Sequence, residues 1–356
     1  MNILVSAYTG LGNFILKTPF IYKIKELWPD AKIDLIVGNS FGAEFVLKNS
    51  EIINETYILK IKASFQAKVK FFLKLRKKRY DAIFLPFDAA PTFLILGALL
   101  LGGTKLVHIN LNLNRNIKQK IRNFIYLFAL PGYRVVPILQ GRHEIDLNYD
   151  LLEAFYDRPM ERTYQTFIAQ KDDPTVLMHY DIKQGQYIVI QPSAANGSLT
   201  AKIWSPVKFE ELLLKINQQY HGMKVVFVGD QGDRDSIKYT SLAEMDNVIN
   251  TMGKTSIAAL STIIKNAAVV IAHDSGVMHI ANALQVNLIA LYGPTDYTRT
   301  RPLALSSHIL FSKNDCLGAM YNFNANESEL AYEYSGSGCM EGISVEDVMK
   351  MIGEIM

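Results

Sequence analysis

The chain has 356 residues, of which 49% are hydrophobic and 20% are charged, and its formal net charge is +3. It is too long for one ordinary domain and long enough for two, each with a sizeable core. So small a positive excess does not indicate a nucleic-acid partner, and we expect none. The two cysteines, Cys316 and Cys339, lack CxxC spacing. They indicate neither a zinc site nor a disulfide framework, and they favour a reducing cytoplasm.

The sequence contains no pattern expected to cross a membrane. Its beginning lacks the basic start and the long apolar run of a signal peptide. The longest apolar stretch, 93–101, is far shorter than the roughly 20 residues that span a bilayer. We therefore expect a cytoplasmic protein whose contact with the inner membrane, if it has one, is peripheral.

The first half of the chain alternates short β-branched or apolar runs with longer helical patterns. Strands are expected at 3–7, 33–37, 56–59, 82–85 and 106–109. Helices are expected at 14–27, 41–47, 65–77, 91–101 and 117–130. This alternation predicts a parallel sheet with helices on both faces.

The second half repeats this rhythm. Strands are expected at 187–191, 224–228, 248–250, 268–272 and 287–291, and the clearest helices at 206–220, 256–265 and 276–284. Between the halves, the charged segment 142–184 has no strand pattern and is expected to form a helix and a linker. The last stretch, 345–355, is an amphipathic helix that could pack back onto the first domain.

These elements predict an α/β protein with two Rossmann-like αβα domains that face a central cleft. We place the domains at 1–170 and 171–343, followed by the C-terminal helix segment 344–356. In open parallel sheets, ligands bind beyond the carboxyl ends of the strands. The residues that directly follow each strand are therefore the candidates for function.

The first such loop contains Gly10, Gly12 and Asn13 and leads into a helix. Glycines at this place allow a tight turn and the close approach of a ligand to a helix N-terminus. The loop lacks the third glycine of a dinucleotide fingerprint and the lysine of a P-loop. A simple strand-to-helix turn and a ligand-binding loop are therefore both open.

A stronger pattern follows the strand expected at 268–272. Asp274, Ser275 and Gly276 form a turn of mostly small residues before a helix, and His279 lies one turn into that helix. Free N–H groups and the helix dipole at this place suit an anionic diphosphate. The alternative is that Asp274 or Ser275 only caps the helix, although capping and phosphate binding are compatible.

Three further residues follow strands of the second half. Asp233 is expected to accept hydrogen bonds from a ribose, unless it lies in a solvated turn. The loop that contains Ser193, a further candidate for binding the nucleotide sugar, leads to Lys202, which could neutralise the charge on a departing diphosphate. An isolated lysine is more often simply solvated. The spacing of Asp233 and Asp235 matches the Asp-x-Asp motif of metal-dependent sugar transferases, but so short a match is a weak indication, and we expect no metal.

Taken together, these motifs resemble glycosyltransferase family 9, the heptosyltransferases, from residue 1 to about 350. The matching stretches are 10–13 with 18–19, 143–148, Lys202 with Trp204 and Phe209, 253–256, 274–279, 292–296 and 339–340. The resemblance implies a GT-B fold and an inverting, metal-independent transfer from a nucleotide-activated sugar, typically ADP-heptose, with no cofactor. It further implies an anionic lipopolysaccharide-type acceptor bound by the first domain and a donor bound by the second.

Carried over position by position, the resemblance assigns the diphosphate to Lys202, His279 and the turn at 274–276, and the ribose to Asp233. Family members commonly have an aspartate as the presumed base where this chain has Asn13. An amide cannot act as a general base. Asp88, which follows the strand at 82–85, is our candidate for that role. The alternatives are that Asn13 only orients the acceptor hydroxyl, or that the chain is a divergent member with poor activity.

Two other functions are kept as alternatives. One is a nucleotide-sugar epimerase, because paired Rossmann domains also support that chemistry. The other is a non-catalytic protein that binds a nucleotide sugar, which Asn13 would explain.

The segment 60–79 carries nine lysines and arginines, interleaved with apolar residues, and no acids. On a helix this gives an apolar stripe flanked by positive charge, a pattern typical of surfaces that meet anionic lipid. The alternative is an ordinary helix whose apolar face packs on the sheet while its basic face is solvated. Both can hold at once.

Overall fold

The computed structural model describes residues 1–38, 45–48, 50–60, 62–101, 106–111, 133–138, 141–169, 171–193, 200–236, 245–312 and 338–356. These residues form two compact units, Met1–Ala169 and Gln170–Met356. The helix expected at 117–130 and most of the one expected at 41–47 lie outside the described residues.

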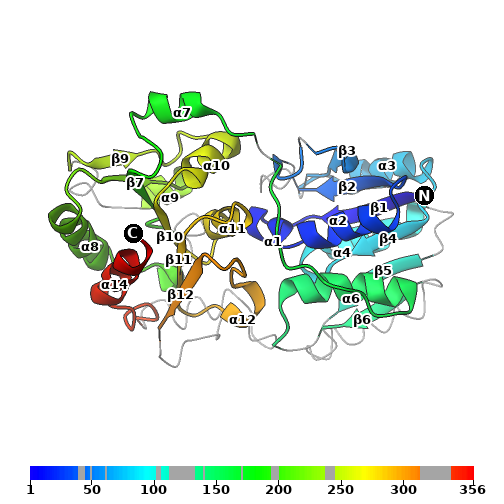
Figure 1. Ribbon diagram of the computed structural model, residues 1–356. Coiled ribbons are helices and arrows are strands. Elements are labelled where there is room, and N and C mark those ends of the chain that lie inside the picture. The colour runs from blue at the N-terminus through cyan, green and yellow to red at the C-terminus, as the bar shows by residue number, and fades with distance from the viewer. Residues whose placement is uncertain are drawn as a thin grey trace. The chain divides into compact units, whose positions relative to one another are not determined.

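The first unit contains a fully parallel sheet (Figure 1). Its strands are β1 (Asn2–Ala7), β2 (Lys32–Val37), β3 (Ile53–Ile58), β4 (Ala82–Leu85), β5 (Leu106–Leu111) and β6 (Tyr133–Pro137), in the spatial order β3-β2-β1-β4-β5-β6. The strand β6 was not expected from the sequence. It is an edge strand that ends in Pro137, and an edge strand needs neither a continuous apolar run nor every backbone N–H.

Helices of the first unit connect and flank these strands. They are α1 (Leu11–Ile15), α2 (Thr18–Leu27), α3 (Phe65–Arg76), α4 (Thr92–Ala98) and α6 (Glu144–Tyr156), with the short 3₁₀ segments η2 (Phe87–Ala89) and η3 (Leu99–Leu101). The single helix expected at 14–27 is interrupted, because α1 ends at Ile15 and α2 begins at Thr18. The Thr18 hydroxyl donates to the Ile15 carbonyl at 2.7 Å, and Pro19 occupies the first turn of α2, where its missing N–H costs nothing.

The second unit contains another fully parallel sheet. Its strands are β7 (Tyr187–Ile190), β8 (Lys224–Phe227), β9 (Val248–Asn250), β10 (Val269–His273), β11 (Leu288–Tyr292) and β12 (Ser307–Phe311), in the order β12-β11-β10-β7-β8-β9. Counted from its own first strand, each sheet has the doubly wound order 3-2-1-4-5-6. The edge strand β12 was not expected, because its residues are only half buried and begin with Ser307 and His308.

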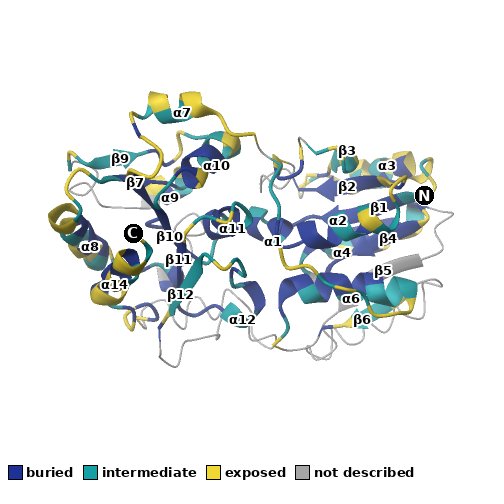
Figure 2. Cartoon of the chain, viewed as in Figure 1, coloured by how far each residue is buried: buried dark blue, intermediate teal, exposed yellow. Residues whose placement is uncertain are grey.

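The helices of the second unit are α7 (Pro174–His179), α8 (Pro206–Gln219), α9 (Gln231–Ser236), α10 (Ile257–Lys265), α11 (Gly276–Ala283), α12 (Tyr297–Thr300) and α14 (Val345–Ile355), with the 3₁₀ segment η5 (Thr200–Lys202). In both units the central strands are buried and most helices expose one face (Figure 2). This burial explains why the central strands read as continuous apolar runs.

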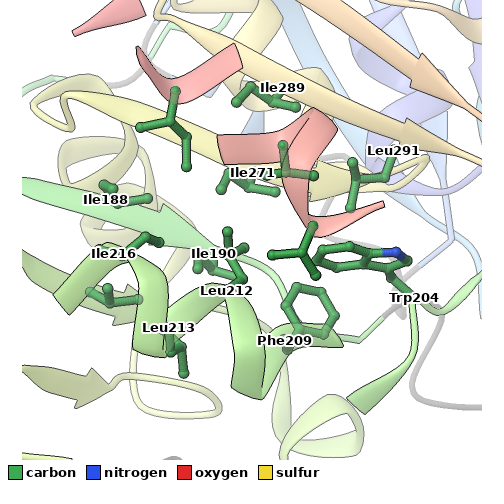
Figure 3. Packing of buried hydrophobic residues seen from close by; sticks show 14 of the residues in the cluster. Ile188, Ile190, Trp204, Phe209, Leu212, Leu213, Ile216, Ile271, Ile289 and Leu291 are labelled. Carbon is green, nitrogen blue, oxygen red and sulfur yellow. The ribbon is translucent and has the colours of Figure 1, made fainter. Parts of the chain in front are cut away.

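The final helix α14 corrects one expectation. Its apolar residues, Val345, Val348 and Ile352 among them, belong to the core of the second unit, and the helix packs beside α8 and β12. Figure 3 shows this core, in which Trp204 and Phe209 lie beside the aliphatic side chains of the sheet and of α8. The amphipathic pattern of α14 correctly predicts a packed face, but that face packs within the second unit and not, as the sequence had left open, on the first domain.

Candidate functional site

The candidate residues gather where each sheet reverses its direction of winding. This reversal falls between β1 and β4 in the first unit and between β7 and β10 in the second. Ligands of open α/β sheets bind at the carboxyl ends of the strands at such a point. In the first unit Asn13 and Asp88 follow β1 and β4, and in the second Lys202 and Asp274 follow β7 and β10.

Asp88 is the centre of the cluster in the first unit. It lies in η2, directly after β4, and its Oδ2 accepts hydrogen bonds from Thr9 Oγ1 at 2.9 Å and from Asn13 Nδ2 at 3.3 Å. Its Oδ1 is buried and has no hydrogen-bond partner among the described residues. Asn13 and the candidate base Asp88, both singled out from the sequence, are therefore neighbours that contact each other.

Lys17 is a member of this cluster that sequence reasoning missed. Its Nζ forms an ion pair with Asp88 Oδ2 and donates to the Asn13 carbonyl at 3.2 Å. The Lys17 side chain is 0% exposed. One signal could have revealed it, because a lysine within the apolar stretch 14–21 must be buried, and a buried charge requires a partner.

Three other residues that follow β1, Tyr8, Gly10 and Gly12, have an informative environment. Gly10 has an ordinary negative φ, and a Cβ added there would meet nothing within 4 Å, so the space beside it is open. Gly12 is buried within α1. Tyr8 packs edge-on against Phe93, and burial raises the pKa of its phenol to about 12. The Tyr8 hydroxyl has no hydrogen-bond partner in the part of the chain that the structure describes.

In the second unit, a side-chain hydrogen bond of Ser275 joins the segment after β10 to the segment after β7. Ser275 occupies the N-cap position of α11, but its side chain does not cap the helix. Instead its hydroxyl donates to Oε1 of Gln191, the residue directly after β7. Capping as the sole role of Ser275 is therefore wrong. Gln191 is a site residue that sequence reasoning missed, although a polar residue directly after a buried strand was an available signal.

Lys202, Asp274 and His279 form an interior cluster beside this turn. Lys202 Nζ lies 3.5 Å from Asp274 Oδ2, and His279 Nε2 lies 4.0 Å from Asp274 Oδ1. These side chains are only 9%, 7% and 3% exposed, respectively. Lys202 is therefore not an ordinary solvated lysine.

The segment that carries Lys202 is anchored by the core. The Trp204 backbone N–H donates to Nε2 of the buried His273 at 2.9 Å, and the Trp204 indole donates to the Ile343 carbonyl at 3.0 Å. Burial lowers the pKa of His273 to about 4, so its imidazole is neutral at pH 7 and can accept this bond. His273 thus acts structurally, by fixing the backbone two residues after Lys202.

Asp233 lies on α9 and is 4% exposed, so the alternative of a solvated turn is wrong. Its Oδ2 accepts from the Asp230 backbone N–H at 3.2 Å. Asp235 is exposed, and residues two apart on a helix point to opposite sides, so the two carboxylates of the Asp-x-Asp pair do not converge. Ser193 is fully buried just after β7, and the rest of its loop, 194–199, lies outside the described residues.

Comparison with known proteins decides the family. Residues 114–329 match the model of glycosyltransferase family 9 (heptosyltransferase). The chain belongs to this family. Among its relatives, lipopolysaccharide heptosyltransferase 3 of Escherichia coli is 26% identical over 302 residues, which cover 82% of this chain and 83% of the relative.

Solved structures of this family have the same fold as the present family 9 glycosyltransferase. A family 9 glycosyltransferase of Veillonella parvula aligns with a TM-score of 0.79 at 17% identity, covering 99% of this chain and 96% of that one. An E. coli heptosyltransferase solved with ADP aligns with a TM-score of 0.67 at 18% identity, covering 100% of both chains. The expected family, the GT-B fold and glycosyltransferase activity are thus confirmed.

The basic segment of this glycosyltransferase forms α3 and its flanks. Phe72 and Leu75 are buried, whereas Phe65 is 81% and Leu73 is 45% exposed. The exposed face also carries four of the cations, Lys70, Lys74, Arg76 and Lys77. The segment therefore packs one face on its unit, as the simpler alternative required, and presents basic and apolar side chains to solvent.

No helix among the described residues is long and apolar enough to cross a bilayer. Cys339 is buried and disulfide-bonded. The cysteine pattern had indicated no disulfide, so this part of the argument for a reducing compartment is wrong.

Proposed function

We propose that this family 9 glycosyltransferase transfers heptose from ADP-heptose to a lipopolysaccharide-type acceptor, with inversion and without a metal ion or other cofactor. The observation that carries the proposal is the interior cluster of Lys202, Asp274 and His279 beside the N-terminus of α11. The second unit binds the donor and the first unit binds the acceptor.

The donor proposal follows from the charge of this cluster. A diphosphate is attracted by the Lys202 ammonium and by the free N–H groups at the start of α11, and His279 and Ser275 can add hydrogen bonds. Asp274 would repel a diphosphate, so we assign it the task of holding Lys202 and His279. Asp233 is assigned to the ribose, and adenine as the base is supported by the relative solved with ADP.

The transfer is a single displacement. The acceptor hydroxyl attacks the anomeric carbon, the bond from that carbon to the diphosphate oxygen breaks, and ADP leaves. Lys202 and the α11 N-terminus stabilise the charge that develops on the diphosphate, which is the task that a metal ion performs in other transferases. The hydroxyl proton passes to Oδ1 of Asp88, the carboxylate oxygen that has no partner among the described residues.

In this scheme Asn13 is not the base. Its amide donates to Oδ2 of Asp88, so Asn13 orients the carboxylate that takes the proton. This assignment keeps Asp88 as the candidate base, and it gives Asn13 a different task from the one considered from the sequence, which was to orient the acceptor hydroxyl.

The proposal is tested by incubating the protein with ADP-heptose and a heptose-deficient lipopolysaccharide core. We expect free ADP, an extended acceptor with inverted anomeric configuration by NMR, and equal rates with and without EDTA. Loss of the reaction in EDTA and its return with Mg²⁺ or Mn²⁺ would disprove metal independence. UDP- and GDP-sugars serve as controls for the choice of base.

The same assay separates the two alternative functions. An epimerase would change the sugar without an acceptor, whereas a transferase releases ADP in step with acceptor extension. A binding protein would retain ADP-heptose with normal affinity and turn over nothing. Membership of family 9 favours transfer over both.

We also propose that the exposed face of α3 contacts anionic lipid headgroups around the acceptor. Leu96 of α4 and Leu99 of η3 are 47% and 46% exposed, and both elements pack against α3. The packing is close, because a Cβ on Gly97 would lie 2.1 Å from the Phe72 ring. Exposed leucines beside a basic helix match a surface that inserts shallowly among acidic headgroups.

A further inference from the structure

The ion pair between Lys17 and Asp88 stands out among the contacts of the first unit because the lysine is wholly buried. The Lys17 side chain is 0% exposed and that of Asp88 is 9% exposed. The two residues are 71 positions apart in the sequence: Lys17 lies just after α1, and Asp88 lies in η2. Removing one partner of such a pair leaves an uncompensated charge, so each residue depends on the other.

The hydrogen bonds of the cluster are distributed unevenly over the carboxylate. Lys17, Thr9 and Asn13 all donate to Oδ2 of Asp88. Oδ1 is buried and accepts from none of the described residues. Three donors on one oxygen fix the plane and the direction of the carboxylate, and they leave the other oxygen without a donor among the described residues.

Lys17 is fixed in turn by its own environment. Its Nζ donates to the carbonyl of Asn13 at 3.2 Å, one turn earlier in the chain, so the ammonium is held by the same loop that holds Asn13. A movement of α1 would therefore displace the ammonium and the amide together. The Lys17 ammonium, together with the Thr9 hydroxyl and the Asn13 amide, thus couples the loop after β1 to the segment after β4.

We propose that Lys17 is a positioning residue for the transfer reaction. It does not contact the substrate. It neutralises Asp88 and directs Oδ1 toward the acceptor hydroxyl, whose proton that oxygen accepts. The inference rests on the proposed function, in which Asp88 is the base. It adds the role of the Lys17 ammonium, which compensates the buried negative charge of Asp88 and orients its carboxylate.

The experiment compares Lys17→Met, Asp88→Asn and the double variant Lys17→Met/Asp88→Asn. Donor binding by calorimetry measures the concentration of folded protein, and kcat and both KM values are then expressed per folded molecule. Lys23→Met is the matched control, because Lys23 is a lysine of the adjacent helix α2, with a side chain 12% exposed and an ion pair to Glu26. That control should keep the parental kcat.

If Lys17 acts through Asp88, Lys17→Met lowers kcat by up to about 100-fold, as expected for a misplaced reacting group, while KM for ADP-heptose is unchanged. The double variant regains the thermal stability that each single variant loses, because no unpaired charge remains. Its kcat nevertheless equals that of Asp88→Asn, since Lys17 has nothing left to position.

A purely structural role gives a different pattern. Lys17→Met would then be less stable but keep the parental kcat per folded molecule, and this result would overturn the inference while leaving Asp88 as the base. Full activity of Asp88→Asn would overturn the proposed base and the inference with it. Absence of transfer by the parent protein would overturn the proposed function itself.

Discussion

Lys202 Nζ lies 3.5 Å from Asp274 Oδ2, after the neighbouring strands β7 and β10, between which the second sheet reverses its direction of winding. Both side chains are more than nine-tenths buried. The ammonium is thus held in the interior by a carboxylate before any anion reaches it. Such preorganisation allows a charge to act on a leaving group without first being ordered.

Lys202→Met should destabilise the protein by about 3 kcal/mol or more, because Asp274 is left as a buried carboxylate without its lysine partner. It should also weaken ADP binding by about 1.5–3 kcal/mol, the range for a hydrogen bond to a charged group. The double variant Lys202→Met/Asp274→Asn should recover stability but not ADP affinity. Calorimetry and urea unfolding check this, with Lys215→Met as the control, because the Lys215 side chain is 37% exposed and its ion pairs lie at the surface. Parental ADP affinity in the stable double variant would exclude Lys202 from the donor site.

Ser275→Ala and His279→Ala should each weaken ADP binding by about 1–3 kcal/mol if each loses a hydrogen bond to the diphosphate. Gln191→Ala separates direct from indirect effects, because Gln191 accepts the Ser275 hydroxyl in the present structure. A direct contact from Ser275 predicts that Gln191→Ala binds ADP almost normally. Unchanged affinity in all three variants would contradict the proposed role of the turn.

Asn13→Asp should destabilise the first unit by about 1–3 kcal/mol at neutral pH. The sequence alone favoured tolerance of this change, since it restores the aspartate common in the family. The structure argues against it, because Asn13 Nδ2 donates to Asp88 Oδ2 at 3.3 Å and a carboxylate there would replace a donor with a like charge. Urea unfolding at pH 7.5 measures the effect, with Asn13→Ala as the neutral reference. An Asn13→Asp variant more stable than the parent would show that the cluster accommodates a second acid.

His273 should make stability fall in mild acid. Its pKa is about 4 in the folded protein, against about 6.5 for an unperturbed histidine, so the unfolded chain binds a proton first as the pH drops. Stability contributed by the neutral ring is complete above pH 6.5 and is lost between about pH 6.5 and 4, amounting to about 3 kcal/mol. Urea unfolding followed by Trp204 fluorescence in a Trp28→Phe background checks this. His273→Gln should flatten the dependence, and the exposed His221→Gln should not.

Neutralising the basic face of α3 should reduce binding to acidic vesicles. Each lysine near such a surface contributes about 1 kcal/mol, so Lys70→Gln/Lys74→Gln should weaken the association by roughly 30-fold. Sedimentation with phosphatidylglycerol vesicles measures it, and neutral phosphatidylcholine vesicles should bind little. Lys183→Gln/Lys350→Gln removes the same charge from exposed sites on the second unit. Equal losses in both double variants would mean that net charge, and not the α3 surface, governs binding.

The sequence alone was sufficient for the central strands, most helices and the positions of Lys202, Asp233 and the turn at 274–276. These features depend on local signals. Apolar runs such as 269–272 identify buried strands, and turn residues directly after them identify the ligand edge of a parallel sheet. The edge strands β6 and β12 were missed for the converse reason, because a half-buried edge imposes little pattern on its residues.

Tertiary structure decided which side chains meet. Lys17 and Asp88 are 71 residues apart, and Gln191 and Ser275 are 84 apart; each pair forms because β1 adjoins β4 and β7 adjoins β10. Likewise, the amphipathic face of α14 indicated that the helix packs somewhere, but only the fold showed that it packs on α8 and β12. A buried charge or an apolar face requires a partner. Which residues become that partner depends on the order of the strands and on the crossover connections, and local sequence patterns do not specify these.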